Sequence, residues 1–400
     1  MRRTALTWYL AALMVLLPFQ TRYIFADGMG DLSVLSIYGV ELLIALGILV
    51  AGGALKFDRK LLPIVGASAL ITTVTALSAL WASSPLFALH AAMHLLFATM
   101  LLALLTDERV DRTFVAQAFI AGLFIPVLFG LIQVVTGVFP ASSLLGIAAR
   151  DAQVLGDSVF YVNGERLLRA YGTFPHPNIF GGYLAIALLM LLTRTVQFGK
   201  WTGLAIAWLA LGLVLTVSHG AWIAVASGLV VFHTSAWVSW RRWLLPIAGA
   251  ATIALCILSI DSVTWSQQLP QSIGDRLIFA QRSLFMFVNH PLLGVGAGNY
   301  IETLSMGGTL SAWWNYQPVH HVGLLMLAEI GIVGMIAIGV GTWRLLRTLF
   351  LQITPAGCAL IAGLLILGLV DHYLWTQWSG VALVAITVLF VLNKKDAPRS

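Results

Sequence analysis

Apolar segments of about 20 residues recur along the whole chain, each separated from the next by a polar stretch, and an α-helix needs about this length to cross the hydrocarbon core of a bilayer. The pattern predicts an all-α fold: a polytopic transmembrane helical bundle of about 12 spans, forming one integral membrane domain over residues 1–400. The predicted spans cover 5–20, 32–54, 61–81, 85–106, 112–137, 177–195, 200–217, 219–236, 243–260, 321–343, 353–370 and 374–392.

The positions of the basic residues predict the orientation of this bundle. If the N-terminus is cytoplasmic, 16 of the 22 Lys and Arg residues lie on the cytoplasmic side. Of the other six, all but Arg22 lie in long loops, which the positive-inside rule does not count. We therefore expect a multi-pass membrane protein with both termini in the cytoplasm. The 16 residues are Arg2, Arg3, Lys56, Arg59, Lys60, Arg109, Arg112, Arg194, Lys200, Arg241, Arg242, Arg344, Arg347, Lys394, Lys395 and Arg399.

Composition excludes the soluble classes of protein. The chain is 60% hydrophobic and 10% charged, far from the roughly 25% charged residues of a soluble domain. Its basic pI of about 9.5 comes from cations between apolar segments and not from a patch, so no nucleic-acid partner is expected. Cys256 and Cys358 fall in different spans at depths about 12 Å apart by helical rise, so we expect neither a disulfide nor a metal cluster. No cofactor is expected either.

Two connections are much longer than helix connections usually need. Residues 138–176 and 261–320 are predicted to be long loops on the periplasmic side, containing short interfacial helices. Within the second loop, the apolar and charged residues of 274–289 alternate in the manner of an amphipathic helix. Chemistry at the membrane surface is expected in these loops.

The first candidate site precedes the sixth span. Two prolines hold His176 in extended backbone, and Asn178 is placed to cap the helix that follows. Free backbone N–H groups at a helix start favour a phosphate, and Arg169 lies close by in sequence. A simple capped junction, with Arg169 in solvent or on lipid headgroups, explains the same residues equally well.

The second long loop supplies the other candidates. Arg276 begins the predicted amphipathic helix and is the choice for a diphosphate contact, because guanidinium pairs with phosphate in a fork geometry. The glycine-rich stretch 290–300 follows no strand, so a tight turn near a substrate is favoured over a nucleotide loop. His320 and His321 end the loop, where an imidazole can take a proton from a hydroxyl near neutral pH. Glu329 is an ionisable group inside a span, which indicates a functional or tightly paired position.

Chemistry-bearing side chains gather at the predicted outer face, whereas the cytoplasmic face carries mainly topogenic cations. His219 makes the outer turn between the seventh and eighth spans, and Asp371 follows the eleventh. The gathered set is Arg169, His176, His219, Arg276, His320, His321 and Asp371.

Three stretches resemble the O-antigen ligase and polymerase family of bacterial membrane glycosyltransferases. The first is 169–183, the second joins Asp275-Arg276-Leu277 to 290–300, and the third runs from His320 through Glu329 and Gly331 to Gly334. The resemblance covers residues 165 to 335 by motif order and extends to the whole chain by its plan of spans. It implies a GT-C-like bundle in a bacterial inner membrane, with an active site on the periplasmic face.

The resemblance further implies an inverting, metal-independent transfer of a glycan from an undecaprenyl diphosphate carrier to a saccharide hydroxyl, as in lipopolysaccharide biosynthesis. His320 would be the base and Arg276 would bind the donor diphosphate. Where family members carry Ser-Arg-Gly, this chain has His219, so we hypothesise that His219 binds the diphosphate as imidazolium while Arg169 supplies the missing charge. His321 replaces the usual Asn or Ser, which leaves open which of the two histidines is the base.

The residues do not choose the acceptor. A lipid A core would make the protein a ligase, and the growing end of another glycan would make it an O-antigen or exopolysaccharide polymerase with the same chemistry. A lipid-linked glycan transporter or flippase is the alternative from another class. Membrane lipids are expected partners in every case. Against a transporter, only Glu41 and Glu329 are acidic groups inside spans, and the polar cluster is one-sided.

Overall fold

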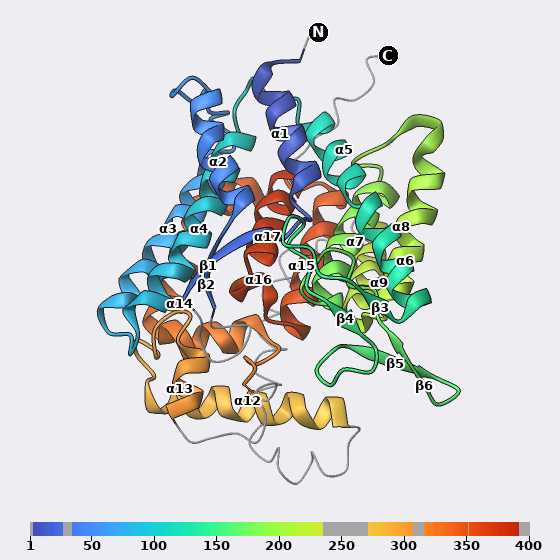
Figure 1. Ribbon diagram of the computed structural model, residues 1–400. Coiled ribbons are helices and arrows are strands. Elements are labelled where there is room, and N and C mark those ends of the chain that lie inside the picture. The colour runs from blue at the N-terminus through green and yellow to red at the C-terminus, as the bar shows by residue number, and fades with distance from the viewer. Residues whose placement is uncertain (1–2, 27–33, 235–270, 307–315, 351, 392–400) are drawn as a thin grey trace.

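The computed structural model describes residues 3–26, 34–234, 271–306, 316–350 and 352–391. The described part is mainly helical, and its helices run side by side as a bundle (Figure 1). The helices are α1 (Ala5–Leu16), α2 (Gly39–Val50), α3 (Leu62–Leu77), η1 (Ser78–Leu80), α4 (Pro85–Leu105), α5 (Arg112–Gly122), α6 (Phe124–Thr136), α7 (Pro177–Leu192), η2 (Gly199–Trp201), α8 (Thr202–Thr216), α9 (His219–Thr234), α12 (Gln271–Asn289), α13 (Tyr300–Met306), α14 (Val322–Phe350), α15 (Pro355–Val370), α16 (Tyr373–Thr376) and α17 (Trp378–Val391).

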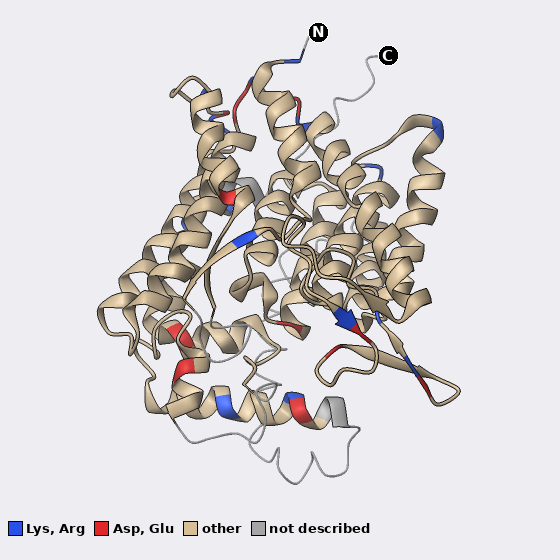
Figure 2. Ribbon diagram, in the orientation of Figure 1, with Lys and Arg blue, Asp and Glu red and all other residues tan. Residues whose placement is uncertain are grey.

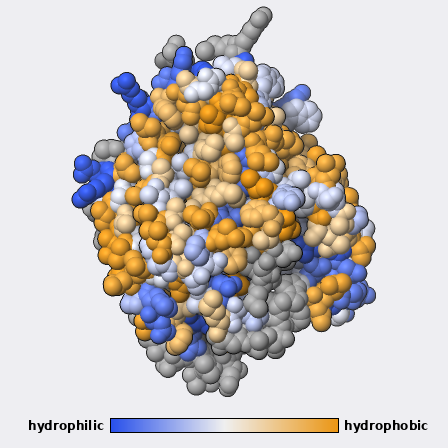
Figure 3. Space-filling model, turned by 60° about the vertical axis from the view of Figure 1, so that its left-hand side comes forward, coloured by the Kyte–Doolittle hydropathy of each residue, from blue (hydrophilic) through white to orange (hydrophobic). Residues whose placement is uncertain are grey.

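Apolar helices of membrane-spanning character dominate the bundle. Among the described residues, five helical stretches are long and apolar enough to cross a membrane, and six more apolar helices are shorter. Lys, Arg, Asp and Glu lie mostly toward the two ends of the bundle (Figure 2), and much of the surface between is hydrophobic (Figure 3). These features are those of a helical membrane protein. They do not establish the count of twelve, and the predicted ninth span, 243–260, lies outside the described residues.

Several predicted spans differ in detail from the helices. The predicted span 32–54 begins with strand β2 (Leu35–Tyr38), which pairs antiparallel with β1 (Arg22–Ala26), because Tyr38 ends the strand and caps α2. The predicted span 112–137 is two helices that break at Leu123. The predicted span 374–392 is also divided, at Gln377, into α16 and α17.

The two long loops are built differently from each other. Residues 138–176 contain no helix; their regular structure is two short antiparallel pairs, which corrects the prediction of interfacial helices there. The pairs join β3 (Val138–Phe139) to β4 (Arg150–Asp151), and β5 (Val159–Val162) to β6 (Glu165–Leu168). The second loop does contain helices, and α12 covers the predicted amphipathic stretch and lies across one end of the bundle (Figure 1).

Helix α7 is the centre of the bundle. Its residues from Ile179 to Leu191 are all buried, and it packs against α8, α9, α15 and α17. A helix that is apolar on every side finds no face for water and so takes the interior position. The start of α7, with His176 and Asn178, therefore lies at the middle of one end of the bundle.

Helix α14 is interrupted at Gly331, whose φ of 61° and ψ of −172° are not helical. The loop that precedes α13 fills the break. Ala328 and Glu329 accept through their carbonyls from the amides of Val295 and Gly296 (2.9 and 2.8 Å). Below the break, the amides of Ile332 and Val333 donate to the carbonyls of Pro291 and Leu292 (2.9 and 3.0 Å). Backbone groups inside an apolar bundle have to be satisfied by protein, so the two segments hold each other.

This interlock explains the glycines of the 290–300 stretch, where we predicted a tight turn. A Cβ on Gly331 would strike the backbone of Leu292 and Gly294, and a Cβ on Gly294 would strike the backbone of Glu329. The glycines allow two backbones to touch.

We predict that Gly331→Ala lowers the stability of the protein. The backbone of Gly331 lies in a region that is almost restricted to glycine, which costs an alanine about 1–3 kcal/mol before the clash with Leu292 is counted. The measurement is the melting temperature of the purified protein in detergent. Gly339→Ala is the matched control, since a Cβ at Gly339 in the same helix meets nothing within 4 Å. Equal melting temperatures for the two variants would contradict the interlock.

Candidate functional site

The candidate site lies where α7 begins. Asn178 comes from the first turn of α7, Arg276 from α12, His320 from the segment before α14, and Asp371 and His372 from the connection after α15. These segments are far apart in the sequence, and the packing of α7 against α15 and of α12 against α14 brings them together.

Asn178 connects a partly buried cation to a buried anion. Its Nδ2 donates to Asp371 Oδ2 (2.8 Å), and its Oδ1 accepts from Arg169 Nη2 (2.8 Å). Arg169 also donates from Nε to the carbonyl of Thr216 (2.7 Å) and from Nη2 to that of Val217 (3.2 Å). Arg169 therefore has protein partners and is not a free headgroup cation. The side chains of Arg169 and Asp371 are held at fixed positions by one amide.

The carboxyl of Asp371 is ionised at neutral pH. Burial alone raises the pKa of Asp371, but the neighbouring imidazoles of His320, His372 and His176 and the amide of Asn178 outweigh burial and lower the pKa from its ordinary value. The backbone amide of His372 donates to Oδ1 (2.8 Å), a further bond that favours the carboxylate.

His320 faces this carboxylate. The ring of His320 stacks on Phe279 with centroids 5.7 Å apart and meets His372 edge-on at 5.2 Å. Its Nδ1 is buried and has no hydrogen-bond partner in the described part of the chain. Burial lowers the pKa of His320 below 6.5, although Asp371 acts to raise it. The imidazole is therefore neutral near pH 7 and can accept a proton.

His321 has a structural role in the described chain. Its Nδ1 accepts from the backbone amide of Leu324 (3.2 Å), so the ring caps the start of α14. The side chain is buried, and only 2% of the residue is exposed. The geometry favours His320 over His321 as the proton acceptor, because the Nδ1 of His321 is already occupied by a backbone donor.

Arg276 lies at the exposed edge of the same cluster. Its Nη1 donates to the carbonyl of Val370 (2.7 Å), directly before Asp371. Arg276 also acts to lower the pKa of both His320 and His372, which places its charge within electrostatic reach of both rings. A guanidinium held by one bond keeps other N–H groups available for an anion.

The cap of α7 is His176 and not Asn178, which corrects the prediction for that helix start. His176 Nδ1 accepts from the amide of Asn178 (3.1 Å), and Nε2 pairs with the Ser158 hydroxyl (3.1 Å). Burial, followed by the charge of Arg169, lowers the pKa of His176 to about 3. The ring is neutral and caps the helix through the backbone amide of Asn178, which leaves the side-chain amide of Asn178 for Asp371.

His219 begins α9 and is exposed. Its ring meets Trp222 edge-on at 5.2 Å. No contact joins it to His320, Arg276 or Asp371 among the described residues, although Arg169 binds the carbonyls just before it. The structure thus brings together five of the seven predicted site residues, whereas His321 caps α14 and His219 lies at the border of the site.

His372 was not predicted as a site residue, and Asp371 was gathered at the outer face without a role. His372 Nδ1 pairs with the Thr376 hydroxyl (2.8 Å), and burial lowers its pKa to about 4. One ligand atom from each of His320, Asp371 and His372 lies within 4.8 Å of the others, a grouping that a divalent ion could occupy. Metal independence remains a prediction. The available signal was the position of the Asp-His pair directly after an apolar span at the predicted outer end.

Glu329 is tightly paired, as expected for an acidic group within a span. Its Oε2 accepts from the indole N–H of Trp375 (2.7 Å), and the backbone amides of Gly298 and Tyr300 also bond to it. Glu41 is likewise paired, with His94 Nδ1 (2.6 Å) and the amide of Tyr38 (2.8 Å). Each carboxylate links segments that are separate in the sequence.

Residues 204–339 match the family model described as O-antigen ligase. This part of the chain is similar to that family. The match contains Arg276, His320 and His321, whereas Arg169, Asn178 and Asp371 lie outside it and join the site only through the fold. The match confirms the predicted family and supports a membrane glycosyltransferase of the ligase or polymerase type. No curated protein matches the chain.

We predict that Gly182→Ala displaces the segment from Asp371 to Tyr373. A Cβ at Gly182 on α7 would overlap the hydroxyl of Tyr373, which follows His372 and is buried without a hydrogen-bond partner among the described residues. The variant should have a lower melting temperature, because the segment from Asp371 to Tyr373 has to move. The measurement is thermal unfolding of the purified protein.

Tyr373→Phe should restore part of that loss, since it removes the atom that clashes. Gly203→Ala, on the neighbouring helix α8 with open space around its Cα, is the control. Additive effects of Gly182→Ala and Tyr373→Phe would contradict the proposed contact.

Proposed function

We propose that the protein is a membrane glycosyltransferase that moves a glycan from undecaprenyl diphosphate to a hydroxyl of a saccharide acceptor. One observation carries the proposal: a neutral imidazole, a carboxylate beside it and an exposed guanidinium meet at one end of an apolar bundle. The match of residues 204–339 to the O-antigen ligase model supports this proposal.

Arg276 binds the donor in this proposal. The diphosphate of the carrier is an anion and becomes the leaving group, so its negative charge increases as the glycosidic bond breaks. The guanidinium of Arg276 is exposed and can offer N–H groups to phosphate oxygens. Exposed His219, near the same helix ends, is the candidate for a second contact when protonated. Arg169 acts through Asn178, which positions Asp371.

His320 is the base in this proposal. The proton of the acceptor hydroxyl moves to His320, the acceptor oxygen bonds to the anomeric carbon, and the bond from that carbon to the diphosphate oxygen breaks with inversion. Asp371 stabilises the imidazolium that forms, as a carboxylate does beside a catalytic histidine. The carrier diphosphate is already an activated leaving group, so the step is proposed to need no metal and no cofactor.

The proposed location is the bacterial inner membrane, with the site on the periplasmic face and both termini in the cytoplasm. In support, α1 begins at the end of the bundle opposite to α12 (Figure 1). A lipid A core acceptor gives a ligase, and a growing glycan gives a polymerase with the same chemistry. A reporter fusion that places residues 271–306 in the cytosol would remove the donor glycan from the site and overturn the proposal.

The direct test is a transfer reaction with purified protein, lipid-diphosphate-linked glycan, two saccharide acceptors and a chelator. We predict that His320→Ala lowers kcat by at least ~100-fold, the usual contribution of a general base. His321→Asn is the control and should keep most of the activity, because an Asn side chain can also cap a helix. A fully active His320→Ala enzyme would show that the base is another group.

We also predict the pH dependence of the reaction. Activity requires neutral His320, so kcat/KM falls as pH drops through the pKa of His320. Because burial lowers this pKa, the acidic limb of the pH profile lies below pH 6.5. Asp371 raises the pKa of His320, so Asp371→Asn should move the limb to still lower pH while it reduces the maximal rate. Asp275→Asn, which removes an exposed and weaker influence, should shift the limb less and keep the rate. A limb that stays in place in Asp371→Asn would contradict the pairing.

A further inference from the structure

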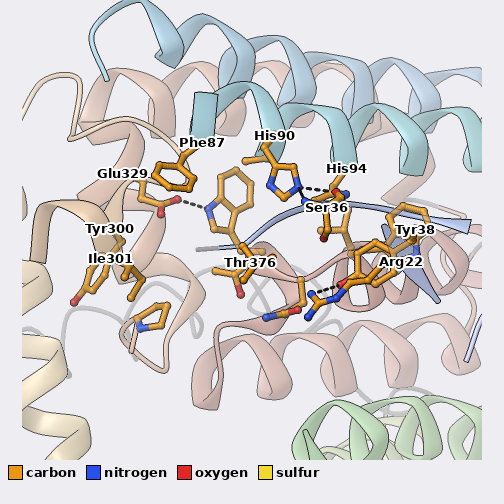
Figure 4. Close-up of a pocket in the computed structure, with 18 residues that line it drawn as sticks. Arg22, Ser36, Tyr38, Phe87, His90, His94, Tyr300, Ile301, Glu329 and Thr376 are labelled. Atoms are coloured by element: carbon orange, nitrogen blue, oxygen red, sulfur yellow. Dashed lines mark hydrogen bonds between the residues drawn. The ribbon is translucent and has the colours of Figure 1, made fainter. Parts of the chain in front are cut away.

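We propose that a cavity next to the His320 cluster binds the acceptor saccharide. This inference rests on the proposed glycan transfer and adds the place of its second substrate. The cavity lies between β1, β2, α4, the start of α13, α16 and α17 (Figure 4). None of the residues that hold Arg276, Asn178 or Asp371 lines it, so it is separate from the donor end of the site.

The short helix α16 is the wall that the cavity shares with the cluster. Thr376 lines the cavity, and its hydroxyl pairs with His372 Nδ1 (2.8 Å). Pro318 also lines it, two residues before His320. His320 does not line the cavity, so a sugar bound there would anchor the acceptor across α16 from the proposed base, and the reacting hydroxyl would belong to a neighbouring sugar of the same acceptor.

Two aromatic side chains supply apolar walls. Trp375 is fixed in orientation by its bond to Glu329 (2.7 Å), and Phe87 lies next to that pair (Figure 4). Glu329 is itself held beside the break in α14. A sugar ring presents C–H groups on its faces and hydroxyls on its rim, so it packs on a rigid aromatic ring while its rim needs polar partners.

Polar groups without protein partners line the same cavity. The indole N–H of Trp378 is buried with no hydrogen-bond partner among the described residues. His90 uses Nε2 for Ser36 (2.8 Å to its carbonyl), which leaves Nδ1 for a ligand. The side-chain amide of Gln377 makes no hydrogen bond within the described chain. Because a buried N–H without a partner is costly, the Trp378 indole favours a ligand that accepts a hydrogen bond, and His90 Nδ1 and the Gln377 amide, both on partly buried residues, can bind further hydroxyls.

The same polar lining argues against the isoprenoid tail of the donor as the occupant. A hydrocarbon chain would leave the Trp378 N–H, His90 Nδ1 and the Gln377 amide without partners. Arg22, whose Nη1 donates to the Tyr38 hydroxyl (3.4 Å), also lines the cavity and gives it a cation that suits an acidic substituent on the acceptor.

The test separates acceptor binding from donor binding in the purified full-length protein. Phe87→Ala and Gln377→Leu should each raise the KM for the acceptor about 3- to 10-fold and leave the KM for the lipid-diphosphate donor unchanged. Leu86→Ala is the matched control, since Leu86 is the neighbour of Phe87 on α4 and is 53% exposed. Trp378→Phe keeps an aromatic ring but loses the unpaired N–H together with part of the indole, so it should raise the acceptor KM; its melting temperature is measured alongside, because Trp378 is only 1% exposed.

Calorimetric titration without donor gives a readout that does not depend on turnover. The probes are delipidated core oligosaccharide and a repeat-unit oligosaccharide, and the same variants should weaken the binding of whichever probe the wild type binds. Unchanged acceptor KM and binding in all three variants overturn the inference, as does a raised donor KM alone. If the wild type binds a probe in this cavity but transfers no glycan, the proposed function fails and the binding site stands.

Discussion

The bond from Asn178 to Asp371 is the interaction on which the site depends. Inside an apolar bundle, a buried carboxylate and a partly buried guanidinium are tolerated only if each has partners. Asn178 donates to Asp371 and accepts from Arg169, and Arg169 in turn donates to the carbonyl of Thr216 at the end of α8. Removing the amide would leave both charges short of a partner, so one residue on the central helix holds the anion that supports His320.

Two further constraints place the remaining parts around that bond. The break of α14 at Gly331 is stable because the 291–296 segment satisfies its free backbone groups. Glu329, next to the break, fixes Trp375 and the start of α13. These bonds fix the position of α16 relative to α14. Helix α16 in turn separates the His320 cluster from the cavity. Pre-organised side chains of this kind are what a transfer between two bound substrates requires.

The division of labour within the site follows from charge. Arg276 is the exposed cation and lies where a lipid diphosphate could approach, whereas Arg169 is enclosed by carbonyls and acts through its partner. His176 and His321 are both helix caps and remain neutral through their occupied Nδ1 atoms. His320 keeps an unpaired Nδ1 beside a carboxylate, so among the histidines of the cluster its geometry fits proton transfer best.

The sequence by itself determined the helical bundle, its apolar spans and the gathering of polar residues at one end, because hydrophobic length and the position of Arg and Lys are local properties. It also indicated Arg276 and His320. It did not predict the strands at 138–168, the cap at His176 or the roles of Asp371 and His372. All of these residues lie outside the family match. Those depend on which helix is central and which loop fills the break in α14. Only tertiary packing decides which segments meet, since each buried polar group selects its partner from a distant part of the chain.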